Sequence, residues 1–502
     1  ILDYPDLRFI TTRHEQATTY MADEYARASG KVGVAMVVPG PGLQNASAGI
    51  TNAYSASAKV LVISGQISRD AISKNVGVLH EINDQLEIVR PITKWQARVL
   101  TAKHIAPAVQ KSFYQLRTGR PRPVEIEMPP EALSEFTEIS AYRSAEIPSL
   151  PINTEAVEEA AAILASSKNP VIWAGGGVHI SGASDQLLAV AEYMQMPVLS
   201  TPEGKGAISD KHYLSLGSPQ GRSTGESKDL LRDFFYTCDV ILAVGTRFAT
   251  ANAASSQKVV QIDVDLQEIG RNNHNTLGIH GDAREVLPHL LGAIKSQTAA
   301  RASRKDEFLK LRTERYNNSA NQVEPQASYV KALREGIPDE GILVTDMTIM
   351  AYYSRAHFHT YNPRSYFTSS YAGNLGSAFP TALGVKVAMP DKPVVSISGD
   401  GGFLFNSQEL ATAVQFGINV VAVVFNDQAY GNVKRDMKTL FNNKSLGVEL
   451  HNPDFIKLAE AYGAIGIRVD GPDALTKAIK EAISINNPVL IEVPIGPMPS
   501  PF

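Results

Sequence analysis

Short runs rich in Val and Ile alternate along the whole chain with segments of helical hydrophobic spacing. The runs include Val32–Val38, Pro170–Ala174, Val240–Val244, Val259–Val264, Ile342–Thr345, Val394–Ile397, Val420–Phe425 and Val489–Val493. Apolar runs this short are typical of strands buried on both faces of a parallel sheet. The helical segments between the runs include Glu15–Ser29, Thr154–Ser167, Gln408–Phe416, Pro453–Tyr462 and Pro472–Ile485. The alternation predicts an α/β fold of doubly wound parallel sheets.

Composition restricts the class of protein further. Of the 502 residues, 44% are hydrophobic and 20% are charged, which excludes a disordered chain because such a chain is too polar to form a core. No apolar run approaches the roughly 18–20 residues that cross a bilayer, so we expect no membrane association. A net charge of −4 gives no electrostatic reason to expect nucleic acid as a partner.

The single cysteine and the first residue bear on location. Cys238 cannot form an internal disulfide, and such cysteine usage predicts the reducing cytoplasm. The chain opens with Ile1 rather than Met, and we expect that a native N-terminal segment precedes it.

Two segments have the composition of linkers between domains. Residues 144–154 carry two prolines and no periodicity, and Thr298–Gln326 is polar with little apolar content. We therefore expect three domains, at residues 1–145, 150–310 and 325–502. The N-caps of three predicted helices would be Asn153 or Thr154, Ser407, and Asn452.

The segment from Val394 to Asn432 contains the sequence feature with the clearest chemistry. One predicted strand runs into Gly399-Asp400-Gly401-Gly402, and the next ends at Asn426-Asp427. Open parallel sheets bind ligands beyond the carboxyl ends of their strands. Two carboxylates there predict a Mg²⁺ or Ca²⁺ site, and the glycines allow backbone N–H groups to approach a phosphate. The alternative interpretation is that both segments are ordinary tight turns.

This segment resembles the cofactor-binding motif of the thiamin diphosphate (thiamine pyrophosphate) enzymes, and among them the acetolactate synthase and 2-keto acid decarboxylase group. The resemblance implies that Asp400, Asp427 and the carbonyl of Ala429 bind Mg²⁺. It implies also that the backbone meets the diphosphate at Gly401, Gly402 and Gly431. The family usually has Asn at the position of Asp427, so this chain adds a negative charge there.

The resemblance covers nearly the whole chain. Arg13-His14-Glu15-Gln16 and Gly40-Pro41-Gly42 look like the family's pyrimidine-binding domain, where Glu15 would activate the cofactor. A glutamate at a helix start can instead simply oppose the helix dipole. In the segment Tyr371–Pro380, the family's pattern places Leu375 beneath the bent cofactor and the Gly373 carbonyl against its amino group.

Three further positions are implied by the same resemblance. Thr348 stands where acetolactate synthases have a Gly-Gln-His contact to the phosphate, and it is the residue there that could donate a side-chain hydrogen bond. Gln66 and His80 correspond to the substrate region, where His80 could move a proton near neutral pH. A solvated histidine paired with its acidic neighbours is the competing interpretation of His80.

The central part of the chain has glycine-rich turns after strands. Gly175-Gly176-Gly177 and Gly245 are of this kind, and some relatives bind FAD in this domain. Other relatives keep the same residues without a nucleotide. FAD is therefore an option that these residues do not favour.

Together these features predict an enzyme that uses thiamin diphosphate and Mg²⁺ to decarboxylate a 2-keto acid or to join it to an aldehyde or keto acceptor. Relatives assemble the site between two chains, so we expect a homodimer or homotetramer. Two alternatives stay open at this point: a flavin-using thiamin oxidase and a catalytically silent regulatory subunit with the same fold.

Overall fold

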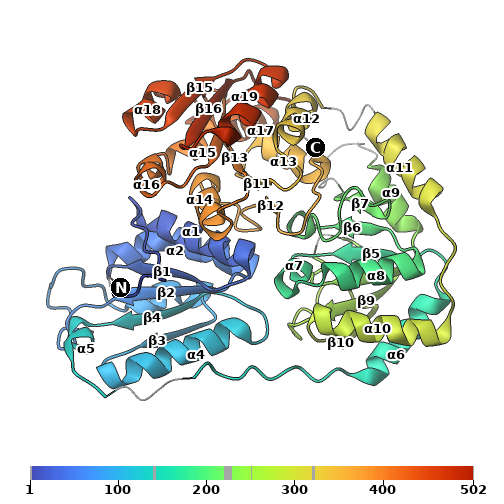
Figure 1. The fold of residues 1–502 in the computed structure, drawn as a ribbon, viewed down its shortest axis with the longest axis horizontal. Helices are drawn as coiled ribbons and strands as arrows, with labels where there is room; N and C mark the ends of the chain where they lie inside the picture. Colours follow the sequence, from blue (N-terminus) through green and yellow to red (C-terminus); the bar gives the residue numbers. More distant parts are fainter. Residues whose placement is uncertain (1–2, 139–142, 220–228, 250, 319–322, 501–502) are drawn as a thin grey trace. The chain divides into compact units, whose positions relative to one another are not determined.

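Three parallel sheets organise the protein in a computed structural model that describes residues 3–138, 143–219, 229–249, 251–318 and 323–500 (Figure 1). The predicted α/β class is confirmed. The chain divides into two compact units, one formed by Ile1–Pro148, Leu343–Thr348 and Ser369–Gly496, and the other by Ser149–Ile342, Ile349–Thr368 and Pro497–Phe502. The first unit holds the predicted site residues.

The N-terminal sheet has four strands in the order β1-β2-β4-β3. Its strands are β1 (Gly33–Val37), β2 (Val60–Gly65), β3 (Trp95–Arg98) and β4 (Val124–Met128). The accompanying helices are α1 (Glu15–Ser29), α2 (Pro41–Ala56), α3 (Gln85–Val89), α4 (Ile105–Arg117) and α5 (Pro130–Ser134), with short 3-10 turns at Arg90–Ile92 and Ala102–His104.

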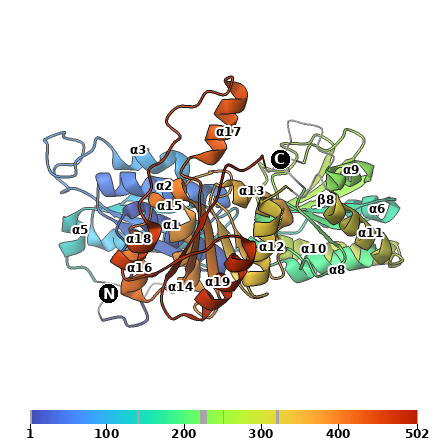
Figure 2. The same ribbon diagram turned by 90° about the horizontal axis from the view of Figure 1, so that it is seen from above.

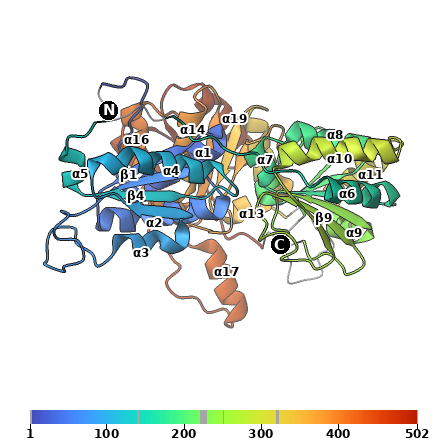
Figure 3. The same cartoon turned by 90° about the horizontal axis from the view of Figure 1, so that it is seen from below.

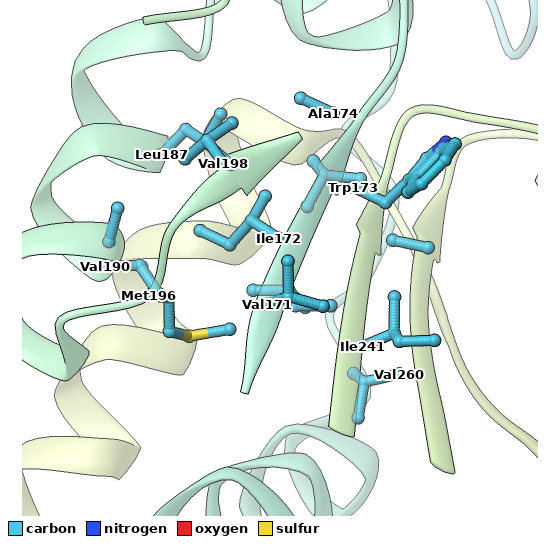
Figure 4. Close-up of a cluster of buried hydrophobic side chains, with 14 of the residues drawn as sticks. Val171, Ile172, Trp173, Ala174, Leu187, Val190, Met196, Val198, Ile241 and Val260 are labelled. Atoms are coloured by element: carbon cyan, nitrogen blue, oxygen red, sulfur yellow. The ribbon is translucent and has the colours of Figure 1, made fainter. Parts of the chain in front are cut away.

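The central sheet has six strands in the order β10-β9-β8-β5-β6-β7. Its strands are β5 (Val171–Ala174), β6 (Val198–Ser200), β7 (Ser215–Gly217), β8 (Val240–Val244), β9 (Lys258–Asp263) and β10 (Thr276–His280). Its helices are α6 (Thr154–Ser166), α7 (Gly177–Ser181), α8 (Ser184–Met194), α9 (Leu230–Thr237), α10 (Ala283–Gln297) and α11 (Lys305–Asn317), with a 3-10 turn at Pro202–Gly204. Aliphatic side chains of β5, β6, β8, β9 and α8 belong to one buried cluster, the core of this domain (Figure 4).

The C-terminal sheet has six strands in the order β12-β11-β13-β14-β16-β15. Its strands are β11 (Ile342–Thr345), β12 (Tyr366–Phe367), β13 (Val394–Gly399), β14 (Val421–Asn426), β15 (Ile465–Arg468) and β16 (Val489–Pro494). The helices of this part are α12 (Gln326–Gly336), α13 (Ile349–His357), α14 (Ala378–Ala388), α15 (Asp400–Leu404), α16 (Glu409–Phe416), α17 (Gly431–Leu440), α18 (Phe455–Ala461) and α19 (Pro472–Ser484).

Helix α1 links the two sheets of the first unit because it packs against both α2 and α14 (Figures 1 and 3). Close approach on both sides requires glycine. A Cβ atom on Gly49 of α2 would lie 2.2 Å from Thr19 Oγ1, and one on Gly384 of α14 would lie 2.3 Å from the Met21 carbonyl oxygen. The helix that begins with Glu15 is therefore held on two faces.

Helix α17 differs from its neighbours because none of its residues is buried. It projects away from the strands and the other helices of the C-terminal part (Figure 2). Val433 and Leu440 on this helix are exposed apolar residues. None of the helices in the described ranges is long and apolar enough to span a membrane.

The predicted helix caps have mixed outcomes. Asn153 caps α6 as predicted, because its side chain accepts a hydrogen bond from Ala156 N. Ser407 is not the cap of α16, since Gln408 holds that position without a side-chain bond. Asn452 is not a cap either: Asp454 caps α18 by accepting from the N–H groups of its first turn.

Candidate active site

Two carboxylates meet at the carboxyl ends of β13 and β14. The strands pair in parallel with Gly399 opposite Phe425, so the residues just beyond each strand lie side by side. Asp400 is buried as the first residue of α15, and its carboxyl group is within hydrogen-bond contact of the Asp427 carboxyl group. The structure therefore brings together the two aspartates that the motif singled out.

Amide groups rather than cations surround this pair. Asn452 Nδ2 donates to Asp400 Oδ2 at 2.6 Å and to Asn426 Oδ1 at 2.9 Å. Burial raises the pKa of Asp400. Burial, followed by the charge of Asp400, raises the pKa of Asp427 to about 6. A buried and a half-buried acid in contact, with no ion pair to a described Lys or Arg, are expected to attract a cation.

The donor set suits a hard divalent ion. Carboxylate and carbonyl oxygens are the ligands that Mg²⁺ and Ca²⁺ prefer. Within the described ranges no group of three or more His, Cys, Asp or Glu side chains could hold a metal, so an ion between Asp400 and Asp427 would need other oxygens as well. The backbone of Ala429, which is buried two residues beyond Asp427, lies close enough to donate its N–H to the Asp427 carboxylate.

The glycines around the pair are required by close contacts. A Cβ atom on Gly431 would lie 2.0 Å from Asp427 Oδ2, and one on Gly401 would lie 2.6 Å from the Tyr430 ring. A Cβ atom on Gly402 would lie 2.7 Å from Asp346 Oδ2. Close packing against neighbouring side chains therefore explains why these three positions are glycine.

Thr348 lies at the same edge of the sheet. A Cβ atom on Gly399 would be 3.6 Å from Thr348 Oγ1, which places the hydroxyl beside the end of β13. Thr348 comes after β11, the strand next to β13, and this explains its position.

The loop that carries Gly373 and Leu375 is tied down by Asp346, a residue that sequence reasoning did not select for the site. Gly376 N donates to both oxygens of the Asp346 carboxylate, at 3.1 and 2.9 Å. Asp346 is buried, and burial raises its pKa to about 6. Asn406 Nδ2 donates to the Gly376 carbonyl at 2.6 Å.

These anchors leave Leu375 itself at the surface. Its side chain is 45% exposed although the loop around it is hydrogen-bonded. The neighbouring Asn374 donates to Tyr20 OH at 2.8 Å and to the Ala48 carbonyl at 2.9 Å, which fixes the loop against α1 and α2. Gly373 has a φ of 66°, a conformation that favours glycine. An apolar side chain held out on a fixed loop is suited to support a ligand.

Glu15 lies at the carboxyl edge of the N-terminal sheet, as the first residue of α1. Its carboxylate accepts one hydrogen bond among the described residues, from Asn45 Nδ2 to Oε2 at 3.1 Å. A Cβ atom on Gly42 would lie 3.6 Å from the other oxygen, Oε1. Glu15 is therefore positioned by α2 and keeps hydrogen-bonding capacity for a ligand.

Gln66 and His80 lie at the same edge but in different situations. Gln66 is buried, and its amide donates to Glu127 Oε1 at 3.1 Å and accepts from Ile67 N at 2.7 Å. His80 is partly exposed, with a φ of 67°, and its ring has no hydrogen bond to a described residue. Glu81 accepts from backbone N–H groups of residues 76–78 instead of pairing with His80.

Sequence reasoning missed four residues whose hydrogen bonds hold parts of the site. Asp346 bonds to Gly376, Asn452 to Asp400, Asn45 to Glu15 and Gln85 to Gly40. Asp346 directly follows a strand, and the rule that applied to Asp400 applies to it. Asn452 was interpreted as a helix cap. Asn45 and Gln85 carry no local signal, because their partners are distant in the sequence.

The central glycines have a packing explanation. A Cβ atom on Gly175 would lie 2.3 Å from the Gly245 carbonyl oxygen, and one on Gly177 would lie 2.5 Å from Gly245 Cα. The turns after β5 and β8 are therefore in backbone contact, which requires these glycines without a nucleotide. They do not support FAD.

Similarity to known proteins extends over nearly the whole chain. Three family models match: "Thiamine pyrophosphate enzyme, N-terminal TPP binding domain" at residues 1–88, "central domain" at 157–290 and "C-terminal TPP binding domain" at 346–493. A probable acetolactate synthase large subunit of Methanocaldococcus jannaschii is 36% identical, over 98% of this chain and 86% of the relative. The acetolactate synthase large subunit of Lactococcus lactis is 33% identical, over 99% and 87%. A probable 2-ketoarginine decarboxylase of Pseudomonas aeruginosa is 31% identical, over 97% and 87%.

Proposed function

The chain belongs to the thiamine pyrophosphate enzyme family, and from this premise we propose that it uses thiamin diphosphate with Mg²⁺ to decarboxylate a 2-keto acid, with release of the product or its transfer to a second carbonyl. The observation that carries this proposal is the Asp400–Asp427 pair. It lies in the matched C-terminal TPP binding domain, at the ends of neighbouring strands and in close contact with glycine backbone.

The residues present fit the cofactor and its metal. Asp400, Asp427 and the Ala429 carbonyl would hold Mg²⁺, whose charge would offset the two carboxylates. The backbone at Gly401, Gly402 and Gly431 would face the diphosphate, and Thr348 would offer a hydroxyl to it.

When bound, thiamin diphosphate would supply the electron sink for the pair of electrons left behind when CO₂ departs from the substrate. The protein's part is to bind, orient and move protons. Glu15 would share a proton with the pyrimidine ring through its free carboxylate oxygen, and Asn45 holds the other oxygen. Leu375 would support the bent cofactor from the loop anchored by Asp346, and the Gly373 carbonyl would accept from the amino group.

Residues near the substrate would decide the fate of the product after CO₂ has left. The ring of His80 has no partner among the described residues and could deliver a proton or hold an acceptor carbonyl. Gln66 uses its amide within the protein, so its contribution would be to shape the wall of the site.

We propose further that the working enzyme is a homodimer or homotetramer. The hydrogen-bond partner of Glu15 is Asn45, whereas those of Asp400 are Asn452 and Asp427, so the two groups share none. Large apolar side chains in the segments that carry His80 and Gly373 are exposed in the single chain, including Leu79 at 82% and Leu375 at 45%. A second copy would cover such a surface, and sedimentation velocity would measure it.

Two other parts of the sequence prediction stay proposals. The buried, unpaired Cys238 supports a cytoplasmic location. The flavin-using oxidase and the silent subunit are not favoured: packing explains the central glycines, and both Glu15 and Asp400 are present. A flavin absorbance band in the purified protein would reopen the first of these alternatives.

A substrate screen tests the proposed function. The purified protein, with thiamin diphosphate and Mg²⁺, is given a panel of 2-keto acids with and without aldehyde or keto acid acceptors. We expect CO₂ release that depends on both additions, together with an aldehyde or a ligated product, and release at least about 100-fold slower from the Glu15→Gln variant. Absence of CO₂ release from every 2-keto acid would contradict the proposal.

A further inference from the structure

Gln85, at the start of α3, connects several segments at the carboxyl edge of the N-terminal sheet. The residue is 1% exposed. Its Nε2 donates to Ser64 Oγ at 3.0 Å, to the Gly65 carbonyl at 2.8 Å and to Glu127 Oε2 at 2.9 Å. Its Oε1 accepts from Gly40 N at 2.7 Å. One buried amide thus joins the ends of β2 and β4 to the turn before α2.

The orientation of this amide is determined by its neighbours. Glu127 and the Gly65 carbonyl can only accept, whereas the Gly40 N–H can only donate, so a flipped amide would lose these bonds. Glu127 is fully buried and also pairs with Arg98. Breaking its bond to Gln85 would leave a buried carboxylate less well satisfied, which is costly.

Gly40 depends on this external bond. It is the N-cap residue of α2 and makes no side-chain cap, with φ 60° and ψ −110°. A Cβ atom there would lie 2.4 Å from the His80 carbonyl oxygen, so no larger residue could supply a cap of its own. The Gln85 amide therefore anchors the N-terminus of α2.

Helix α2 in turn positions the Glu15 carboxylate. Asn45, in the second turn of α2, donates the hydrogen bond that Glu15 accepts. Gly42, in the first turn, faces the other carboxylate oxygen. A shift at Gly40 would move both contacts together, because they belong to one rigid helix.

We propose that Asn45 and Gln85 are positioning residues for Glu15, Asn45 directly and Gln85 through the anchored start of α2. The proposal rests on the proposed function, in which Glu15 exchanges a proton with the cofactor. Loss of either amide leaves the metal and diphosphate residues in place, since these belong to the C-terminal sheet. The proton exchange then slows while the affinity for the cofactor is kept.

The experiment measures hydrogen–deuterium exchange at C2 of thiamin diphosphate bound to the full-length protein with Mg²⁺, and the cofactor Kd by calorimetry. The variants are Asn45→Ala, at an exposed position that the fold tolerates, and Gln85→Met, which keeps the volume of the side chain. Gln257→Met is the matched control. Gln257 is also buried, and its amide donates to the Phe235 and Cys238 carbonyls in the other unit.

We expect the exchange rate to fall about 10- to 100-fold in Asn45→Ala and Gln85→Met, as for small displacements of a catalytic group, with a change in Kd of less than about threefold. Turnover should show the same split, with kcat lowered and KM nearly unchanged. Gln257→Met should exchange at the wild-type rate.

Two outcomes separate the failure of this inference from that of the proposed function. Wild-type exchange in both variants, while Glu15→Gln has lost it, would overturn the positioning role alone. Wild-type exchange in Glu15→Gln would overturn the role of Glu15 and the inference with it. If Gln85→Met unfolds, the exchange rate of Asn45→Ala decides.

Discussion

The carboxyl edges of the C-terminal and N-terminal sheets both hold buried acids, but their surroundings differ. At the C-terminal edge, Asp400 contacts Asp427 and accepts a hydrogen bond from Asn452, and neither acid has an ion pair with a described Lys or Arg. At the N-terminal edge, Glu127 is bonded to Arg98, Gln66 and Gln85. An acid that the fold leaves uncompensated is available to a ligand, whereas an acid that the fold has satisfied serves to hold other residues in position.

Glu15 stands between these two cases. It lies on the N-terminal edge beside the satisfied network, yet one of its carboxylate oxygens has no hydrogen bond to a described residue. Glu15 therefore has the ligand-facing role at this edge, and Gln66 and Gln85 have a supporting one, although all three are polar residues at the same sheet edge.

The largest expected effect comes from Glu15→Gln. Gln keeps the shape and the bond to Asn45 but cannot share a proton with the cofactor, so turnover should fall by about 10²–10⁴-fold. Cofactor affinity and thermal stability should stay near wild type. Measurements of kcat and of the cofactor Kd check the predicted loss of turnover and the unchanged affinity. Turnover at the wild-type rate in Glu15→Gln would contradict the ligand-facing role of Glu15.

The next effect concerns the C-terminal pair. Asp400→Ala removes one carboxylate from the proposed metal site, and we expect Mg²⁺-dependent binding of thiamin diphosphate to weaken by at least about 100-fold in calorimetry. Asp454→Ala, which removes the exposed cap of α18 on the same sheet, is the control. Unchanged metal-dependent binding in Asp400→Ala would contradict the metal assignment.

A stability measurement sharpens the comparison at the N-terminal edge. Glu125, beside Glu127 on β4, is buried with a bond from Ser64 Oγ at 2.5 Å, and burial raises its pKa to about 8. The folded state keeps the Glu125 proton that the unfolded chain loses above about pH 4.5. The free energy of unfolding should therefore fall as pH rises from about 4.5 to 8, and level off above.

Glu125→Gln stays neutral and should remove this fall. We expect it to match wild type near pH 5 and to be more stable near pH 8, by on the order of 3 kcal/mol. Urea unfolding at several pH values measures this difference. Identical pH dependence in the two proteins would mean that Glu125 is not the buried neutral acid that its surroundings indicate.

The smallest effect is expected at His80. Replacement by Ala should leave C2 exchange intact and change the ratio of released aldehyde to ligated product by a few-fold, or shift the pH dependence of that ratio. His274→Ala, at an exposed position of the central part, is the control. An unchanged ratio and pH profile would remove His80 from the site.

Local sequence patterns were sufficient for several parts of this protein. The Val- and Ile-rich runs predicted buried parallel strands because a strand covered on both faces needs apolar side chains throughout. The helix beginning at Glu15 was predicted with the bounds that the structure has. The motifs after β13 and β14 predicted that Asp400 and Asp427 meet at one edge, since strand ends in parallel sheets face the same side.

Tertiary structure decided which side chains satisfy one another. The sheet order places β13 beside β14 and β11, and only this order brings Asp400, Asp427 and Asp346 to one place. Asn452 was predicted as a helix cap, whereas in the structure its Nδ2 donates to Asp400 and Asp454 caps α18. Gln85 accepts a hydrogen bond from Gly40, 45 residues away in the sequence, and no local pattern predicts that pairing. A short polar motif predicts the turn or helix cap that its own backbone can form. The groups that compensate a buried charge, in contrast, meet only when the sheets have formed.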